Sequence, residues 1–109
     1  MASFNRQIAI ERVGGDEDLL KEIAGLFLGE YPGLMAEIEL AVASNDPDRL
    51  QRAAHTLKGS LGTLGADESF PLALELELKG RRRQMEGADQ FLGDLRGSLV
   101  KLHAELTSL

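Results

Sequence analysis

The chain has 109 residues, of which 43% are hydrophobic and 28% charged, a composition typical of one folded globular domain. It contains no cysteine, which excludes disulfides, cysteine-ligated zinc and thiol catalysis. The net charge of −6 and the low aromatic content of 5% argue against nucleic acid as a partner, because phosphate binding requires a basic surface.

The first two predicted helices are separated by Gly14-Gly15. A short helix is predicted over residues 4–13, and Asp16 is a suitable N-cap for a longer helix with acidic residues in its first turn. Pro32 lacks a backbone donor, so we expect the long helix to be kinked there but to continue. The amphipathic pattern that predicts this helix consists of Leu19, Leu20, Ile23, Leu26, Phe27, Tyr31, Leu34, Ile38, Ala41 and Val42, mostly at spacings of three and four.

The third predicted helix has the clearest boundaries in the chain. Asp46 is its N-cap, Pro47 its first residue and Gly65 the residue after its last turn, which predicts a helix over residues 47–64. A fourth helix is predicted over residues 67–85 and a fifth from Asp89 onward. Residues 72–78 alternate like a strand, but no second such segment exists to pair with them, so they are interpreted as helix, with Pro71 in its first turn.

These elements predict an all-α fold in a single domain over residues 1–109. The expected architecture is an antiparallel four-helix bundle, up-down-up-down, with a short additional N-terminal helix. The sequence shows no signal peptide, and its longest apolar region, residues 23–28, is too short to cross a membrane. We therefore expect a cytoplasmic chain without membrane contact.

The third helix has two distinct faces. Leucine and alanine form its apolar face, and the opposite polar face points to solvent with His55 near its centre. An interior glycine costs a helix about 1 kcal/mol relative to alanine, so the two glycines on the polar face indicate a bare surface that lets a partner reach the imidazole. The polar face consists of Asp48, Gln51, Arg52, His55, Lys58, Gly59 and Gly62.

An exposed neutral imidazole can act as a nucleophile, and Lys58 beside it can stabilise phosphoryl oxygens. Two alternatives stay open at this point, since a surface histidine is often only solvated and helix glycines can serve close packing.

His103 lacks such neighbours and is interpreted as a solvated or interface residue. Lys79 and the arginines at 81–83 are interpreted as cations that offset a helix dipole, with a phosphate-binding patch as the alternative. No metal-ligand spacing or nucleotide-binding glycine loop is present.

The segment His55-Thr56-Leu57-Lys58-Gly59-Ser60, followed by Leu64-Gly65, resembles the signature of histidine phosphotransfer (HPt) domains of two-component phosphorelays. That signature reads His-x-Leu-Lys-Gly-small, followed by an apolar residue and glycine. The resemblance extends over nearly the whole chain through Gly14-Gly15-Asp16, Asn45-Asp46 and Leu76-Glu77. The sequence departs from the family at Ser69, a usually apolar position, and at Pro71.

The resemblance implies that the fold is a four-helix bundle and that His55 accepts a phosphoryl group. The donor would be a receiver-domain aspartate or a kinase domain, and another receiver would take the group. Lys58 would contact the phosphoryl oxygens, and Gly59 would leave room for the receiver. Glu77 stands where kinase-attached relatives place a carboxylate against the other imidazole nitrogen, whereas many stand-alone relatives leave that nitrogen to water.

The chain is therefore expected to be a phosphoryl carrier and not an enzyme, without an ATP site, metal or cofactor; the magnesium would belong to the receiver. Expected partners are response-regulator receiver domains and a sensor histidine kinase, and the chain is expected to be a monomer. We expect Gly62, Gln51 and Arg52 to join Lys58 and Gly59 in contacting the phosphoryl group or the partner. The alternative function is a helical adaptor that docks a partner through its glycine-lined face without phosphorylation. The sequence leaves open whether this is a free protein or a module of a larger sensor.

Overall fold

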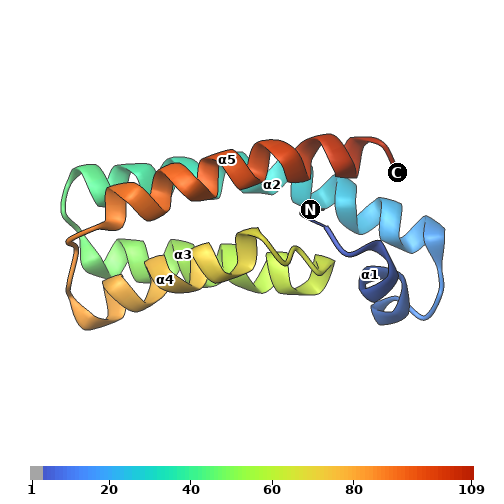
Figure 1. Cartoon of the computed structure of the whole chain (residues 1–109), viewed down its shortest axis with the longest axis horizontal. Helices are drawn as coiled ribbons and strands as arrows, with labels where there is room; N and C mark the ends of the chain where they lie inside the picture. Colours follow the sequence, from blue (N-terminus) through green and yellow to red (C-terminus); the bar gives the residue numbers. More distant parts are fainter. Residues whose placement is uncertain (1–3) are drawn as a thin grey trace.

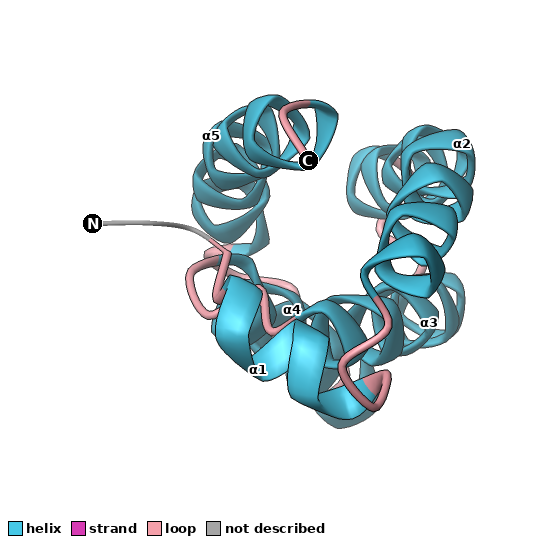
Figure 2. Cartoon of the chain, turned by 90° about the vertical axis from the view of Figure 1, so that its right-hand side faces the viewer, coloured by secondary structure: helices cyan, strands magenta, loops and turns pink. Residues whose placement is uncertain are grey.

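The computed structural model describes residues 4–109, which form helices and no strands. Successive long helices run in opposite directions, so α2 to α5 form an antiparallel up-down-up-down bundle with α1 at one end (Figure 1). The end-on view in Figure 2 shows the four long helices around a common centre. The predicted fold class is confirmed. The helices are α1 (Arg6–Arg12), α2 (Glu17–Ala43), α3 (Pro47–Leu64), α4 (Ser69–Arg82) and α5 (Ala88–Thr107).

The first three helices begin at side-chain caps. The carboxylates of Asp16 and Asp46 accept bonds from the backbone N–H groups of Leu19 and Arg49, as expected for the predicted N-caps. Gly65 ends α3 in the left-handed conformation, with φ of 67°. The bounds of α3 therefore agree with the sequence prediction.

The long helix α2 continues through Pro32, as predicted. Pro32 has no backbone N–H, so the carbonyl of Leu28, one turn earlier in the helix, has no helical hydrogen-bond donor. Both Pro32 and Gly33 are exposed, which places the interruption on the side of the helix that water can reach. The core side of α2 is unaffected and carries Met35 and Ile38 inward.

The fourth helix is shorter than predicted, beginning at Ser69 and ending at Arg82. Glu68 at its N-cap makes no side-chain cap bond, and Arg83 adopts a left-handed conformation with φ of 55° at its C-terminus. Neither residue is a strong sequence signal for a helix end, which explains the error in the bounds. The alternating segment 72–78 is helical, and Pro71 lies in the first turn, as predicted.

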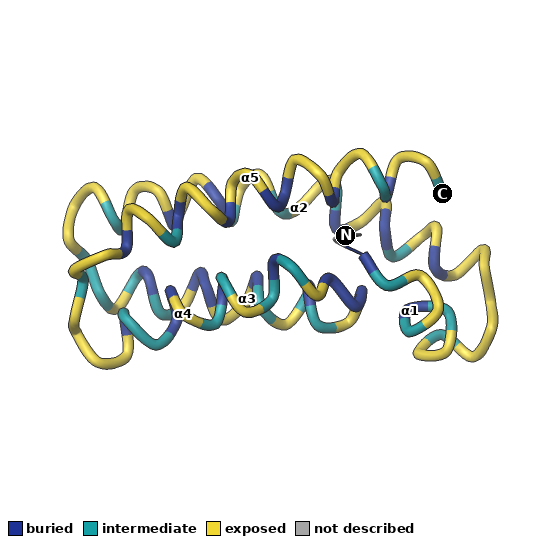
Figure 3. Tube along the Cα trace, viewed as in Figure 1, coloured by how far each residue is buried: buried dark blue, intermediate teal, exposed yellow. Residues whose placement is uncertain are grey.

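The core is built from the facing sides of the four long helices (Figure 3). A buried polar pair interrupts it, because the hydroxyl groups of Ser69 and Ser98 lie 2.8 Å apart between α4 and α5. Ser98 also donates to the carbonyl of Leu95, so both buried hydroxyl groups have partners. The largest fully buried apolar side chains are Leu20, Ile38, Leu50, Leu57, Leu61, Leu64, Leu76, Leu95 and Leu102.

The short helix α1 packs against the junction between α3 and α4. The N–H of Asn5 donates to the carbonyl of Gly65 at 2.9 Å, and the side chain of Asn5 caps α1 by accepting from Ile8. Within residues 4–109, no helix combines the length and the apolar character that crossing a membrane requires.

Candidate functional site

His55 lies in the middle of α3 with its side chain 66% exposed. The opposite side of the helix is anchored in the core by Leu57 and Leu61, which are fully buried. The predicted apolar face of α3 is therefore confirmed, and it fixes the rotation of the helix that presents the imidazole outward.

Glu77 on α4 lies against His55, and its side chain is only 1% exposed. The buried face of α4 is otherwise small or apolar, with Ala73, Leu76 and Gly80 around the glutamate. Isolated buried carboxylates are unfavourable, so such a group needs close polar partners. Three side chains supply them.

The first partner is the imidazole, whose Nδ1 lies 2.7 Å from Oε2 of Glu77. The second is Lys58, whose Nζ forms an ion pair with Oε1 at 2.7 Å. The third is Arg81, whose Nη2 donates to Oε2 at 3.0 Å. One buried carboxylate therefore joins a histidine and two cations from two helices.

These contacts determine the ionisation of Glu77. Burial alone raises the pKa of the carboxyl group, but the contacts from Lys58 and His55 outweigh burial. The resulting pKa lies below the ordinary value of 4.5, so the group is a carboxylate at neutral pH. An ionised Glu77 only accepts hydrogen bonds, so Nδ1 of His55 carries the proton in this contact.

A glycine allows α3 and α4 to approach closely enough for this contact. A Cβ at position 80 would lie 2.6 Å from the carbonyl oxygen of Pro47 and 2.7 Å from the backbone nitrogen of Gln51. Both distances are shorter than real Cβ contacts, so Gly80 is required by the packing of the two helices. The sequence analysis did not identify this glycine, because only the relative placement of α3 and α4 reveals its role.

The prediction that Lys58 faces open solvent was wrong. Its side chain is 22% exposed and is held against the buried carboxylate of Glu77. The helical wheel placed Lys58 correctly beside His55, but it does not show α4, which covers this side of the helix. Its role toward phosphoryl oxygens stays a prediction.

The two glycines of the polar face differ in their surroundings. A Cβ at Gly59 would meet nothing within 4 Å, so the surface one turn from His55 is open. At Gly62 it would lie 3.2 Å from the ring of Phe70 on α4. The expectation of a bare surface at Gly62 was therefore wrong, since this glycine faces a neighbouring helix.

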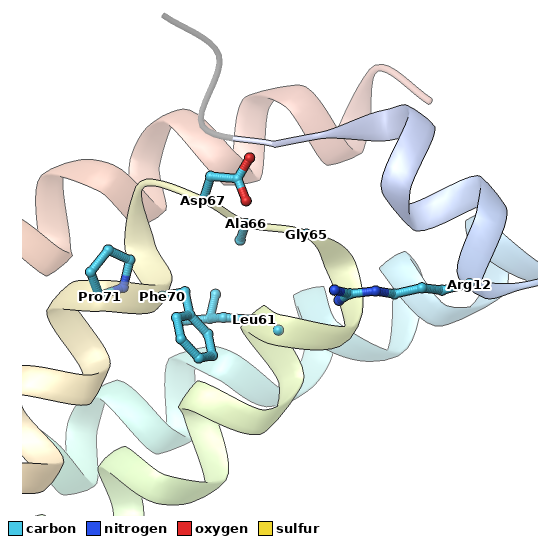
Figure 4. Close-up of a pocket in the computed structure, with 8 residues that line it drawn as sticks. Arg12, Leu61, Gly65, Ala66, Asp67, Phe70 and Pro71 are labelled. Carbon is cyan, nitrogen blue, oxygen red and sulfur yellow. The ribbon is translucent and has the colours of Figure 1, made fainter.

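Gly62 borders a hollow of about 260 Å³ between α1, the end of α3 and the start of α4 (Figure 4). Arg12 reaches toward the hollow from α1, and Phe70 and Pro71 line it from α4. This hollow is separate from the cluster around Glu77, none of whose members line it.

The remaining predicted binding residues flank the histidine on α3. Arg52 is exposed, whereas Gln51 is half-buried with its backbone against Gly80. No contact brings either side chain to Glu77, and their roles in partner binding stay predictions. No group of three His, Cys, Asp or Glu side chains within residues 4–109 is arranged to hold a metal ion.

The second histidine has a different environment. His103 on α5 is exposed, and its Nδ1 lies 2.7 Å from the hydroxyl group of Tyr31 on α2. It has neither a buried carboxylate nor a lysine against its ring.

Arg81 is the member of the cluster that the sequence analysis assigned to a different role. It lies in the last turn of α4 with Lys79 and Arg82, as the helix-dipole interpretation expects. The spacing of four residues from Glu77 is the available sequence signal, because such residues are neighbours on a helix surface. This spacing does not predict that Glu77 is buried or that it lies beside His55.

Comparison with known proteins identifies the family. The family model described as Hpt domain matches residues 22–109, which is most of the chain. The chain therefore belongs to the Hpt domain family, the histidine phosphotransfer domains of phosphorelays. No curated protein matches the chain.

Two solved structures share the fold over nearly the full chain. One is histidine-containing phosphotransfer protein B (HptB) from Pseudomonas aeruginosa PAO1, with 17% identity and a TM-score of 0.89. The other is the HPT domain of the Hpt sensor hybrid histidine kinase from Shewanella, with 20% identity and a TM-score of 0.87. Each match covers 97% of this chain and 92% of the other. At 17% and 20% sequence identity, the similarity to these two structures shows a shared fold.

Proposed function

We propose that His55 accepts a phosphoryl group on Nε2 from the aspartyl phosphate of a receiver domain and passes it to the aspartate of another receiver. The contact between Nδ1 and Glu77 is the observation that carries this proposal. With the proton on Nδ1, the lone pair of Nε2 is free, and the ring is exposed. Nε2 is therefore the nucleophilic atom.

The transfer step needs no proton to leave the ring. The Nε2 lone pair forms a bond to phosphorus while the bond between phosphorus and the aspartyl oxygen breaks, which releases the receiver's carboxylate. The imidazole becomes positively charged, and its Nδ1–H stays directed at Glu77. A fixed carboxylate at this position stabilises the developing charge without rearrangement. Transfer to the next receiver is the reverse of this step.

The chain acts as a monomeric carrier between partners. Magnesium and the acidic residues that bind it belong to the receiver domain, and ATP belongs to a sensor histidine kinase that supplies the phosphoryl group. The open surface at Gly59 supports docking of a receiver beside His55, because no side chain stands in its way. Lys58, Arg52 and Gln51, on the same helix as His55, flank this surface.

The proposal is tested by incubating the chain with a receiver domain labelled on its aspartate, in magnesium. The wild-type chain and His55→Gln are compared, with His103→Gln as the matched control on α5. We expect label on the wild type and on His103→Gln, and none on His55→Gln. The bond should be labile in acid and stable in alkali, as a phosphoramidate is. Label that persists in His55→Gln would overturn the assignment, and a wild type that binds receivers but never takes label would favour the adaptor function.

A further inference from the structure

Arg81 contacts the same carboxylate oxygen as the histidine. Its Nη2 and the Nδ1 of His55 both reach Oε2 of Glu77, while Lys58 alone reaches Oε1. Arg81 is 55% exposed and lies one turn beyond Glu77 on α4. Arg81 forms no hydrogen bond or ion pair with His55 itself, so any effect it has on the imidazole passes through Glu77.

Lys58 has two competing tasks once the proposed function is accepted. Before transfer its ammonium group is bound to Glu77, with the side chain 22% exposed. The phosphoryl group that approaches the neighbouring imidazole attracts the same ammonium group. If Lys58 turned to the phosphoryl oxygens before the imidazole gained its positive charge, Glu77 would lose one of its cations while 1% exposed, and an under-compensated buried carboxylate is strongly unfavourable.

We propose that Arg81 is the positioning residue that resolves this conflict. It keeps Glu77 paired and in place through Oε2, so that Lys58 can leave Oε1 for the phosphoryl group without releasing the carboxylate from His55. The inference rests on the proposed function of His55. Arg81 neither gains nor loses a proton, and it takes no part in the bonds that form and break.

The geometry favours Arg81 for this role over the other cations at the end of α4. Arg83 is paired with Asp48 at 3.0 Å, and Lys79 binds the backbone carbonyl of Glu86 and lies over the ring of Phe91. Arg82 is exposed and has no such contact. Arg82 is therefore the matched control, since its loss removes the same charge from the same turn.

The first test measures single-turnover transfer from a labelled receiver that phosphorylates the wild-type chain. We expect Arg81→Gln to lower the maximal rate of transfer about tenfold, because it loses one hydrogen bond between charged groups. The receiver concentration that gives half the maximal rate should stay within about twofold of the wild-type value. Arg82→Gln should transfer at the wild-type rate, and Arg81→Lys should recover part of the loss. Equal rates for Arg81→Gln and Arg82→Gln would overturn the inference. A change confined to the half-saturating concentration would also overturn it, by making Arg81 a docking residue.

The second test needs no receiver and is read in the unphosphorylated chain. Nitrogen–proton correlation spectra of the imidazole report which nitrogen of His55 carries the proton. Lys58→Ala and Arg81→Gln should each retain the Nδ1–H form, and the double variant should lose it by more than the sum of the single effects, because no cation then holds Glu77. Additive effects of the two substitutions would contradict the proposal that Arg81 holds Glu77 in place when Lys58 leaves it. If the wild type takes no label on His55 while the spectra show this coupling, the proposed function fails and the positioning role of Arg81 toward Glu77 stands.

Discussion

Glu77 is the one charged side chain among residues 4–109 that the core buries, and the properties of the site follow from its three partners. The carboxylate fixes the proton on Nδ1 of His55 and draws Lys58 out of solvent. A glutamine at this position would have nearly the same shape but would provide no charge for the two cations. Substitution by glutamine therefore separates the effect of charge from that of packing.

The pH dependence of stability should report the charge of Glu77. Its pKa is lower in the folded chain than the ordinary 4.5, so the carboxylate stabilises the fold above pH 4.5. This stabilisation declines as the pH falls below that value toward the folded pKa. At about pH 7 we expect the wild type to exceed Glu77→Gln by about 1–3 kcal/mol in free energy of unfolding. In urea titrations at about pH 3, the difference in free energy of unfolding between wild type and Glu77→Gln should be smaller than at about pH 7.

Glu75→Gln is the control for this measurement, because it removes an exposed carboxylate from the same helix. It should leave the pH dependence of the wild type unchanged. A difference between wild type and Glu77→Gln that is the same at both pH values would show that the charge of Glu77 does not stabilise the fold.

At the scale of the elements, the site depends on how closely α3 and α4 pack. Gly80 brings the helices together, and Gly59 leaves the outer surface of α3 open. The two glycines therefore have opposite surroundings, and substitutions at them should have opposite consequences.

Gly80→Ala should destabilise the chain and disturb the site. Its Cβ would be placed 2.6 Å from a backbone carbonyl, so α4 must move away from α3, at a cost of about 2 kcal/mol or more. The shift should also lengthen the contact between His55 and Glu77, which would be seen as loss of a single imidazole tautomer in nitrogen–proton spectra. Gly97→Ala, where a Cβ meets nothing within 4 Å, should be stabilising or neutral. Equal stability of Gly80→Ala and wild type would contradict the close packing.

Gly59→Gln should fold but transfer poorly. The added side chain meets no neighbour and replaces a weak helix former, so thermal stability should be equal or slightly higher. It stands one turn from His55, where it obstructs the receiver, so transfer from a labelled receiver should slow by about tenfold or more. Gly97→Gln adds the same side chain to an open position on α5, which packs against α2 and α4, and should transfer normally. Normal transfer by Gly59→Gln would show that the open surface is not used for docking.

At the scale of the whole molecule, the bundle was predictable because its signals are local. The ends of α3 depend on Asp46, Pro47 and Gly65, each of which acts on its own neighbours in the chain. The ends of α4 were misplaced because Glu68 and Arg83 carry no such signal. His55 was identified by its exposed face and by the family resemblance.

The carboxylate cluster was only partly predictable, because it depends on contacts between helices. The resemblance pointed to Glu77 and left open whether water takes its place; the structure shows the direct contact with His55. The enclosure of Lys58, the packing of Gly62 on Phe70 and the contact of Arg81 with Glu77 all arise from α4 lying over one side of α3. A helical wheel of α3 alone contains none of this information.

The most direct test of the account is to determine which imidazole nitrogen of His55 carries the phosphoryl group. The chain is phosphorylated by a labelled receiver, and nitrogen–proton and phosphorus spectra are recorded before the group is lost. The account predicts a phosphoryl group on Nε2 with a proton retained on Nδ1, because Glu77 occupies the Nδ1 side. A phosphoryl group on Nδ1 would require this contact to break and would contradict the account, as would phosphorylation at any residue other than His55.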